Sequence, residues 1–169
     1  LIKMLAAINN AALDDGTDHF QPSNLQITTI DVGNAATNII PGNARAAFNI
    51  RFNNTHSSES LMAWLRERFN SVGGDYDLEF HVTGDAFLTA PGPFSNLMSS
   101  AVERVTGQKP DLSTTGGTSD ARFIKDFCPV AEFGLISQTM HKIDERVAIA
   151  DLENLTDIYE TVLNDYFAS

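Results

Sequence analysis

The sequence predicts a chain of two parts, an α+β domain over residues 1–88 and an α/β segment over residues 89–169. In the first part, apolar and polar residues alternate along short segments, which is typical of strands with one buried face. In the second part, helical patterns alternate with a short, nearly continuous apolar segment, which is typical of a buried strand between helices. The segment Thr89-Ala-Pro-Gly-Pro93 interrupts both patterns and marks the boundary.

The first part has the predicted order helix, strand, strand, helix, strand. These elements cover residues 1–13, 25–32, 44–52, 57–70 and 77–82. In the last of these segments Leu78, Phe80 and Val82 alternate with polar residues and are expected to face inward. One further strand upstream would complete the β-α-β-β-α-β order of a ferredoxin-like domain. Because the chain opens at Leu1 inside a helical pattern, we expect that upstream sequence, including this first strand, is missing.

The predicted strand over residues 44–52 has the clearest alternation. Ala46, Phe48 and Ile50 share the face that is expected to pack on the core. Arg51 lies on the other face, so its side chain is expected to point away from the core.

The second part contains three predicted helices and one predicted strand. The helices cover residues 94–105 and 119–127 and the stretch that begins at Asp151, and the strand covers residues 129–133. Loops over residues 112–118 and 137–147 lie between these elements. This alternation of helices with a buried strand predicts an α/β segment.

The composition limits the classes of partner. Lysine and arginine together number 11 against 22 aspartate and glutamate residues, which gives a formal net charge of -11. Nucleic-acid binding needs a basic surface that replaces counterions, so we expect no nucleic-acid partner. No apolar stretch approaches the roughly 20 residues that a membrane helix needs, so we expect no membrane partner and a cytoplasmic protein.

One of the four histidines stands out by its position. His19 is interpreted as a solvated loop residue, His56 as a surface or capping residue, and His81 as an exposed strand residue. His141 lies in a polar loop after the predicted buried strand, where ligands of open α/β sheets gather. Because neutral imidazole is a common zinc ligand, a metal ligand and a solvated loop histidine both stay open at this point.

Two loops carry residues that suit ligand binding. In Ser113-Thr-Thr-Gly-Gly-Thr-Ser-Asp120, adjacent glycines let the backbone approach a ligand, and a following helix offers N–H groups to an anion. An ordinary capped helix start explains this segment equally well. Asn38, before Ile-Ile-Pro41, is either a turn residue or a polar contact to a ligand.

Six motifs run through the chain in order. They are Asn38-Ile-Ile-Pro41, Ala46-Ala-Phe-Asn-Ile-Arg51, Gly84-Asp-Ala-Phe-Leu88, Thr115-Gly-Gly-Thr-Ser-Asp-Ala-Arg-Phe123, Glu132-Phe-Gly134 and Met140-His-Lys-Ile-Asp-Glu-Arg-Val147. Together they resemble the dinuclear zinc aminoacylase and carboxypeptidase family of metallopeptidases. The fourth and sixth motifs in combination point to its desuccinylase branch.

The resemblance implies a fold and a partner. Members of this family carry a ferredoxin-like dimerisation domain inserted in an α/β catalytic domain. Residues 1–88 would then be most of the dimerisation domain, through which a homodimer forms. Residues 89–169 would be the last portion of the catalytic domain.

The resemblance also implies an activity. Its desuccinylase branch hydrolyses N-succinyl-L,L-diaminopimelate, a dicarboxylate amide, to succinate and L,L-diaminopimelate in bacterial lysine biosynthesis. Family members use two zinc ions, or cobalt in their place, with a metal-bound water and a glutamate general base. Two alternatives stay open: a related deacylase or carboxypeptidase of the family, and a non-catalytic dimerisation module.

The family's functional residues carry over to five positions. His141 matches the last zinc ligand, Asn38 and Arg51 match substrate contacts of the dimerisation domain, and Gly117 and Thr118 match a substrate-contacting loop near the metals. A guanidinium binds a carboxylate with two hydrogen bonds, which suits Arg51. The other zinc ligands and the general base belong upstream. We therefore expect no catalytic residue in this chain, no activity of the chain alone, and only weak zinc binding.

Overall fold

The computed structural model describes residues 1–115, 119–136 and 138–168 and divides into two compact units. The first unit contains residues 1–88 together with Thr114 and Thr115. The second unit begins at Thr89 and contains the C-terminal helix. Each unit has a hydrophobic core of its own.

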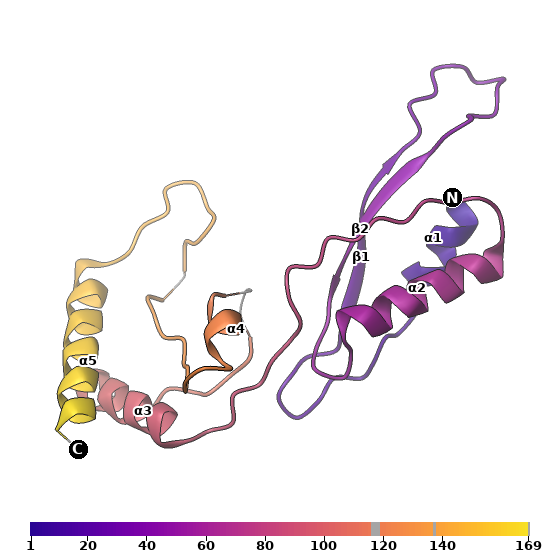
Figure 1. Ribbon diagram of the computed structural model, residues 1–169. Helices are drawn as coiled ribbons and strands as arrows, with labels where there is room; N and C mark the ends of the chain where they lie inside the picture. Colours follow the sequence, from indigo (N-terminus) through magenta and orange to yellow (C-terminus); the bar gives the residue numbers. More distant parts are fainter. Residues whose placement is uncertain (116–118, 137, 169) are drawn as a thin grey trace. The chain divides into compact units, whose positions relative to one another are not determined.

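The first unit is a β-hairpin with two helices (Figure 1). Its elements are α1 (Ile2–Asn9), β1 (Asn24–Asp31), β2 (Arg45–Arg51) and α2 (Ser58–Val72). The two strands are antiparallel, and they pair Asn24 with Arg51 at one end and Asp31 with Arg45 at the other. This helix–strand–strand–helix order confirms an α+β unit.

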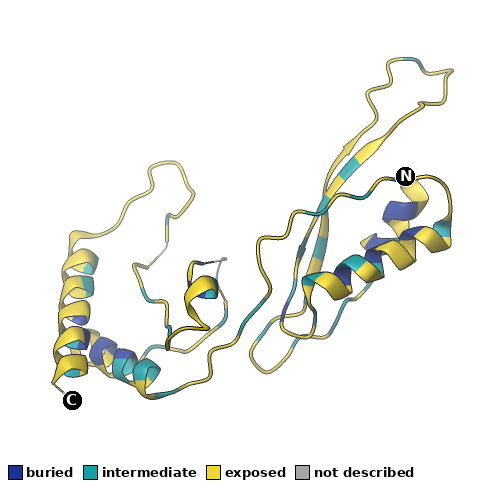
Figure 2. Ribbon diagram, viewed as in Figure 1, coloured by how far each residue is buried: buried dark blue, intermediate teal, exposed yellow. Residues whose placement is uncertain are grey.

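The core of this unit lies between the helices and one face of the hairpin (Figure 2). Its buried side chains are Met4, Leu5, Ile8, Leu65 and Phe69. The expected alternation of β2 is confirmed: Ala46, Phe48 and Ile50 are half-buried against this core, and Arg51 is exposed. Removing such apolar side chains from water contributes up to about 1.5–3 kcal/mol each, which is what holds the hairpin to the helices.

The predicted third strand is absent from the part of the chain that the structure describes. Leu78 and Phe80 are half-buried and pack on the core, as the alternation predicts, and Tyr76 packs there too, but this segment forms no ladder. Val82 was expected to face inward and is instead 48% exposed. A strand needs a hydrogen-bonded neighbour, and in the described sheet β2 pairs with β1 alone. The ferredoxin-like sheet is therefore not formed within these residues.

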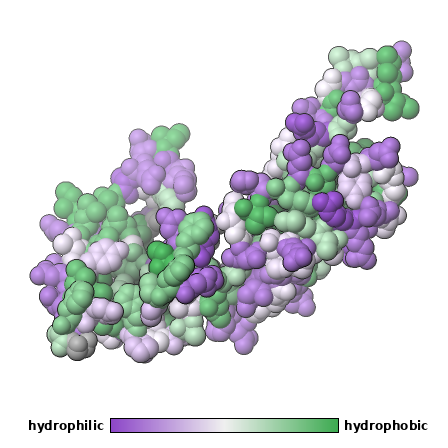
Figure 3. Space-filling model, viewed as in Figure 1, coloured by the Kyte–Doolittle hydropathy of each residue, from purple (hydrophilic) through white to green (hydrophobic). Residues whose placement is uncertain are grey.

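The second unit is helical in its described residues. Its elements are α3 (Pro93–Thr106), α4 (Ala121–Ile124) and α5 (Ile149–Phe167). Their core is made by Met98, Ala101, Val102, Ile158 and Val162. Figure 3 shows many hydrophobic residues on the surface of this unit, and Phe127, Ile149 and Phe167 are each at least 74% exposed.

Two expected elements of the second unit differ from the structure. The helix expected over residues 119–127 is only the four residues of α4. The strand expected over residues 129–133 does not form, because no described segment of this unit pairs with it. Instead, the hydroxyl of Tyr159 in α5 donates a hydrogen bond of 2.7 Å to the backbone carbonyl oxygen of Phe133 in this segment. None of the helices in the described ranges has the length and apolar character to cross a bilayer.

Candidate functional site

The β1–β2 hairpin carries two of the predicted substrate residues at opposite ends. Arg51 is the last residue of β2 and pairs with Asn24, the first residue of β1. Asn38 lies in the loop over residues 32–44, beyond the other end of the ladder. A strand of the length of β2 spans about 20 Å, so the hairpin does not bring Asn38 and Arg51 together.

The guanidinium of Arg51 is available to an anion. Its side chain is exposed on the face opposite the core. Across residues 1–115, 119–136 and 138–168, no hydrogen bond or ion pair engages this guanidinium. A carboxylate can therefore bind it through two parallel N–H···O bonds without displacing a protein partner.

The Asn34 side chain organises the loop that carries Asn38. Its Nδ2 donates hydrogen bonds to the carbonyl oxygens of Ala36 at 3.0 Å and of Ile39 at 2.8 Å. Asn38 lies between these two acceptors, and its side chain is exposed. Ile40 is 92% exposed, and Figure 3 shows hydrophobic residues at this end of the hairpin. The loop therefore presents an amide beside an apolar surface.

A partly buried polar cluster lies at the Arg51 end of the hairpin. It consists of Asp14, Ser23, Asn53 and His56, and is called the Asp14 cluster below. Asn53 is 2% exposed; its Nδ2 donates to Asp14 Oδ1 at 2.6 Å, and its backbone N–H donates to Ser23 Oγ at 3.0 Å. Asp14 Oδ1 also accepts from the backbone N–H groups of Gly16 at 2.7 Å and Ser23 at 3.2 Å. The cluster joins the loop before β1 to the chain just after β2.

His56 contributes to the cluster from just before α2. Its Nε2 lies 3.2 Å from Asp14 Oδ2 and 3.2 Å from the carbonyl oxygen of Leu13. Both neighbours are acceptors, so Nε2 carries a proton. The sequence position of this histidine alone indicates a surface or capping residue, because the contact with Asp14 joins two segments that are distant in the sequence.

The carboxyl group of Asp14 is held in its charged form. Burial by itself would raise the pKa of this carboxyl, because burial disfavours the charged state. Hydrogen bonds from Ser23, Gly16 and Asn53 outweigh burial and lower the pKa from 3.8 to about 2. Asp14 is therefore an ionised acceptor at neutral pH, and three segments of chain donate to it.

His141 lies in a closed turn of the second unit. Thr139 Oγ1 donates to the Arg146 carbonyl oxygen at 2.7 Å and accepts from the Arg146 backbone N–H at 2.9 Å, which closes the loop at its base. His141 has a φ of 61°, in the left-handed region that few non-glycine residues occupy. Its imidazole is exposed, and its backbone N–H lies 3.4 Å from Glu145 Oε2. The loop thus presents an accessible imidazole.

Gly117 and Thr118 lie outside the described residues. Arg122, shortly after them in the sequence, is a further candidate that the motifs alone do not indicate. Arg122 Nη1 donates to the Ser119 carbonyl oxygen at 2.9 Å, and its guanidinium lies 4.4 Å from the Phe123 ring centroid. Within the described ranges, its buried Nε has no hydrogen-bond partner. In the sequence, Arg122 could have been found as the cationic residue of the short helix that follows the two adjacent glycines.

Comparison with known proteins identifies the relatives of this chain. Residues 1–77 match the family model described as a peptidase dimerisation domain. The chain is 54% identical to a succinyl-diaminopimelate desuccinylase of Parvibaculum lavamentivorans, with 99% of this chain and 44% of that protein covered. It is 60% identical to the desuccinylase of Rhodospirillum rubrum, with 92% of this chain and 41% of that protein covered. The chain is homologous to succinyl-diaminopimelate desuccinylases.

These desuccinylase relatives confirm the resemblance read from the six motifs. The protein of the same name from Rhodospirillum centenum is 55% identical over 99% of the chain. The chain spans less than half the length of each of these three relatives. The name desuccinylase is therefore given to proteins that are more than twice as long as this chain.

One predicted metal ligand, His141, lies in the described part of this desuccinylase homologue. Imidazole nitrogen is a common zinc ligand, and the exposed imidazole of His141 suits that role. A structural or catalytic zinc needs at least three protein ligands. In the described ranges, no group of three His, Cys, Asp or Glu side chains is close enough to hold an ion. The described residues therefore fit one ligand of a metal site and not the whole site.

Proposed function

We propose that this chain is part of a metal-dependent amidohydrolase that converts N-succinyl-L,L-diaminopimelate to succinate and L,L-diaminopimelate. Desuccinylase relatives that are 54–60% identical over at least 92% of the chain support this reaction. The structural observation that carries the proposal is the exposed guanidinium of Arg51 at the end of β2, which has no hydrogen-bond or ion-pair partner among the described residues. The substrate is rich in carboxylates, which are the groups a guanidinium binds best.

Arg51 is proposed to hold a substrate carboxylate, and Asn38 is proposed to hydrogen-bond the substrate from the hairpin loop. An Asn amide both donates and accepts, so Asn38 can bind either an amide or a carboxylate. Gly117 and Thr118 are proposed to contact the substrate through backbone and hydroxyl groups. These assignments place proposed substrate contacts on both units.

His141 is proposed as one zinc ligand of a dinuclear site whose other ligands lie outside this chain. When bound, the metal supplies Lewis-acid polarisation of the scissile amide carbonyl. His141 lies in the turn closed by Thr139 and Arg146, and its exposed imidazole suits that role. No general base is assigned to this chain.

The two units are proposed to have different roles. Residues 1–88 are proposed as the dimerisation domain, through which a homodimer forms, since residues 1–77 match the peptidase dimerisation model. Residues 89–169 are proposed as part of the catalytic domain. The substrate-binding hairpin then belongs to the dimerisation domain and the metal ligand to the catalytic domain.

Substrate profiling of the full-length, zinc-loaded protein tests the proposal. We expect N-succinyl-L,L-diaminopimelate to be hydrolysed with a kcat/KM that is at least about 100-fold above that of N-acetylornithine, because a pocket built to pair charged groups rejects analogues that lack them. Preferred hydrolysis of N-acetylornithine or of a dipeptide would assign the chain to another activity of the family. No hydrolysis of any of these amides would favour a non-catalytic dimerisation role.

A further inference from the structure

We propose that Asp14 and Asn53 are positioning residues for Arg51, because they fix the end of the hairpin from which its side chain projects. The inference rests on the proposed function, which assigns Arg51 to a substrate carboxylate. Neither Asp14 nor Asn53 would touch the substrate. Both would act by holding the backbone that carries the guanidinium.

The Asp14 cluster begins where the β1–β2 ladder stops. Asn24 and Arg51 are the last ladder pair at this end. Ser23 precedes Asn24, and Asn53 follows Arg51 by two residues. The hydrogen bond from the Asn53 backbone N–H to Ser23 Oγ, at 3.0 Å, joins the two chains just beyond that pair. The Ser23 side chain thus continues the connection between the two chains beyond the last backbone pair of the ladder.

Asp14 ties a third segment to this point. Its Oδ1 accepts from Asn53 Nδ2 at 2.6 Å and from the Gly16 N–H at 2.7 Å. Asn53 Nδ2 also donates to the Gln21 carbonyl oxygen at 3.1 Å. A partly buried carboxylate that lost these donors would have fewer partners for its charge, which costs free energy. The loop before β1 therefore cannot move away from the end of β2 without that penalty.

Asn53 also ties the end of β2 to the start of α2. Its Oδ1 accepts from the Thr55 backbone N–H at 2.9 Å and from Thr55 Oγ1 at 2.6 Å. Helix α2 then starts at Ser58 and buries Leu65 and Phe69 in the core. The backbone next to Arg51 is thus connected through Asn53 to the most buried part of the unit.

The opposite end of the hairpin is held differently. There the ladder ends at Asp31 and Arg45, and the side-chain hydrogen bonds of Asn34 stay within the loop itself. Arg45 and Arg51 lie on the same exposed face of one strand, six residues apart. The Asp14 cluster lies at the Arg51 end. Two-point binding of a carboxylate needs the guanidinium within about 0.5 Å and 10–20° of its productive geometry, which a fixed backbone helps to supply.

A double-mutant cycle in the full-length, zinc-loaded protein tests this inference. Asp14→Asn keeps the shape of the side chain and removes its charge, and Asp15→Asn makes the same change at an exposed neighbour. We expect Asp14→Asn to raise KM for N-succinyl-L,L-diaminopimelate about tenfold with kcat changed less than about twofold, since displacement of a binding group costs binding. Asp15→Asn is expected to leave both constants unchanged.

The decisive comparison is the same change in an Arg51→Gln background. If Asp14 acts through Arg51, Asp14→Asn has no further effect on KM once Arg51 is replaced. An equal KM effect in both backgrounds, or a fall in kcat that tracks a lower melting temperature, would overturn the inference and leave the proposed function intact. An unchanged KM for Arg51→Gln itself would remove the proposed substrate contact of Arg51 and overturn the inference, while hydrolysis of the substrate would still support the proposed function.

A milder variant keeps the test usable if Asp14→Asn does not fold. Ser23→Ala removes the hydroxyl that accepts from the Asn53 backbone N–H and hydrogen-bonds Asp14, but it leaves the Asp14 carboxylate in place. We expect it to raise KM about threefold, in the range of one ordinary hydrogen bond, and only when Arg51 is present. A KM that is unchanged by Ser23→Ala in a folded protein would contradict the positioning role.

Discussion

Asn53 Nδ2 donates a hydrogen bond of 2.6 Å to Asp14 Oδ1, although 39 residues separate the two in the sequence. This contact joins the loop before β1 to the chain after β2. It lies two residues beyond Arg51, the exposed cation at the end of β2. The Asp14 cluster and the candidate binding residue Arg51 therefore lie at the same end of the hairpin.

The Asp14 carboxyl should make stability depend on pH in the acid range. Its pKa in the folded protein is about 2, against 3.8 for the ordinary side chain. A folded-state pKa below the unfolded value contributes stability that is fully present above about pH 4 and is lost as pH falls toward 2. We expect urea unfolding of wild type and Asp14→Asn to differ by about 2 kcal/mol more at pH 6 than at pH 2.

Asp15→Asn is the matched control for this measurement, because Asp15 is the exposed neighbour of Asp14. Its free energy of unfolding should follow that of the wild type over the whole range. A stability difference between wild type and Asp14→Asn that stays constant from pH 6 to pH 2 would contradict the assignment of a depressed pKa to Asp14.

Two arginines of β2 should differ in their effect on substrate binding. Arg51→Gln is expected to raise KM for N-succinyl-L,L-diaminopimelate about 10–100-fold in the full-length protein, the range for a hydrogen-bonded charged pair. Arg45→Gln changes the same residue type on the same face of the strand and should change KM less than about twofold, as is usual for an exposed charge without a bound partner. Steady-state kinetics on both variants gives the comparison. Equal effects of the two substitutions would indicate only a general loss of positive charge.

The local patterns of the sequence were enough to find most elements of the first unit. The hairpin and α2 lie within a few residues of the predicted ranges, because alternation and helical periodicity are properties of neighbouring residues. Helix α1 ends at Asn9 rather than near residue 13, where two adjacent asparagines, weak helix formers, follow its apolar stripe.

The elements that failed depend on partners distant in the sequence. Alternation correctly placed Leu78 and Phe80 on the core, but a ladder also requires a neighbouring strand. The segment over residues 129–133 failed for the same reason. The Asp14 cluster was missed because its members come from three separate segments, and each of them reads as an ordinary turn or cap residue by itself.

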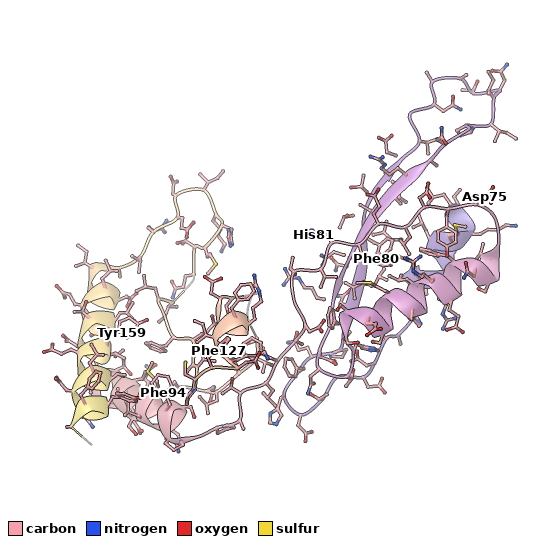
Figure 4. All side chains as sticks on the ribbon, viewed as in Figure 1. Asp75, Phe80, His81, Phe94, Phe127 and Tyr159 are labelled. Carbon is pink, nitrogen blue, oxygen red and sulfur yellow. The ribbon has the colours of Figure 1, made fainter. Side chains whose placement is uncertain are left out.

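The extended segment after α2 should contribute to stability through its alternate side chains. Phe80 packs on the core, and Arg66 lies 5.3 Å from its ring centroid; Figure 4 shows Phe80 beside α2. Phe80→Ala is expected to lower the free energy of unfolding by about 1–2 kcal/mol, less than for a fully buried phenylalanine. Val82→Ala, at a site that is 48% exposed, should cost less than about 0.5 kcal/mol. Similar losses for both variants in urea unfolding would show that the segment packs differently.

His141 should decide the metal content of the full-length protein. His141→Asn removes the imidazole and keeps a residue type that tolerates the left-handed backbone at φ 61°. We expect zinc affinity at one of two sites to fall about 100-fold or more, with loss of hydrolysis, because losing a direct ligand costs more than losing its hydrogen-bonded neighbour. His81→Asn, at an exposed histidine of the first unit, should leave zinc content unchanged. Two tightly bound zinc ions in His141→Asn would remove this residue from the metal site.

The chain of 169 residues by itself should neither hold zinc tightly nor hydrolyse the substrate. Its described residues bring together no group of three metal-binding side chains, and a single imidazole competes poorly with water for a zinc ion. Zinc titration of the isolated chain against a chelating indicator should therefore detect only weak binding, which His141→Asn reduces further. Desuccinylation by the isolated chain at a rate near that of the full-length protein would contradict the proposal that the remaining ligands and the general base lie outside it.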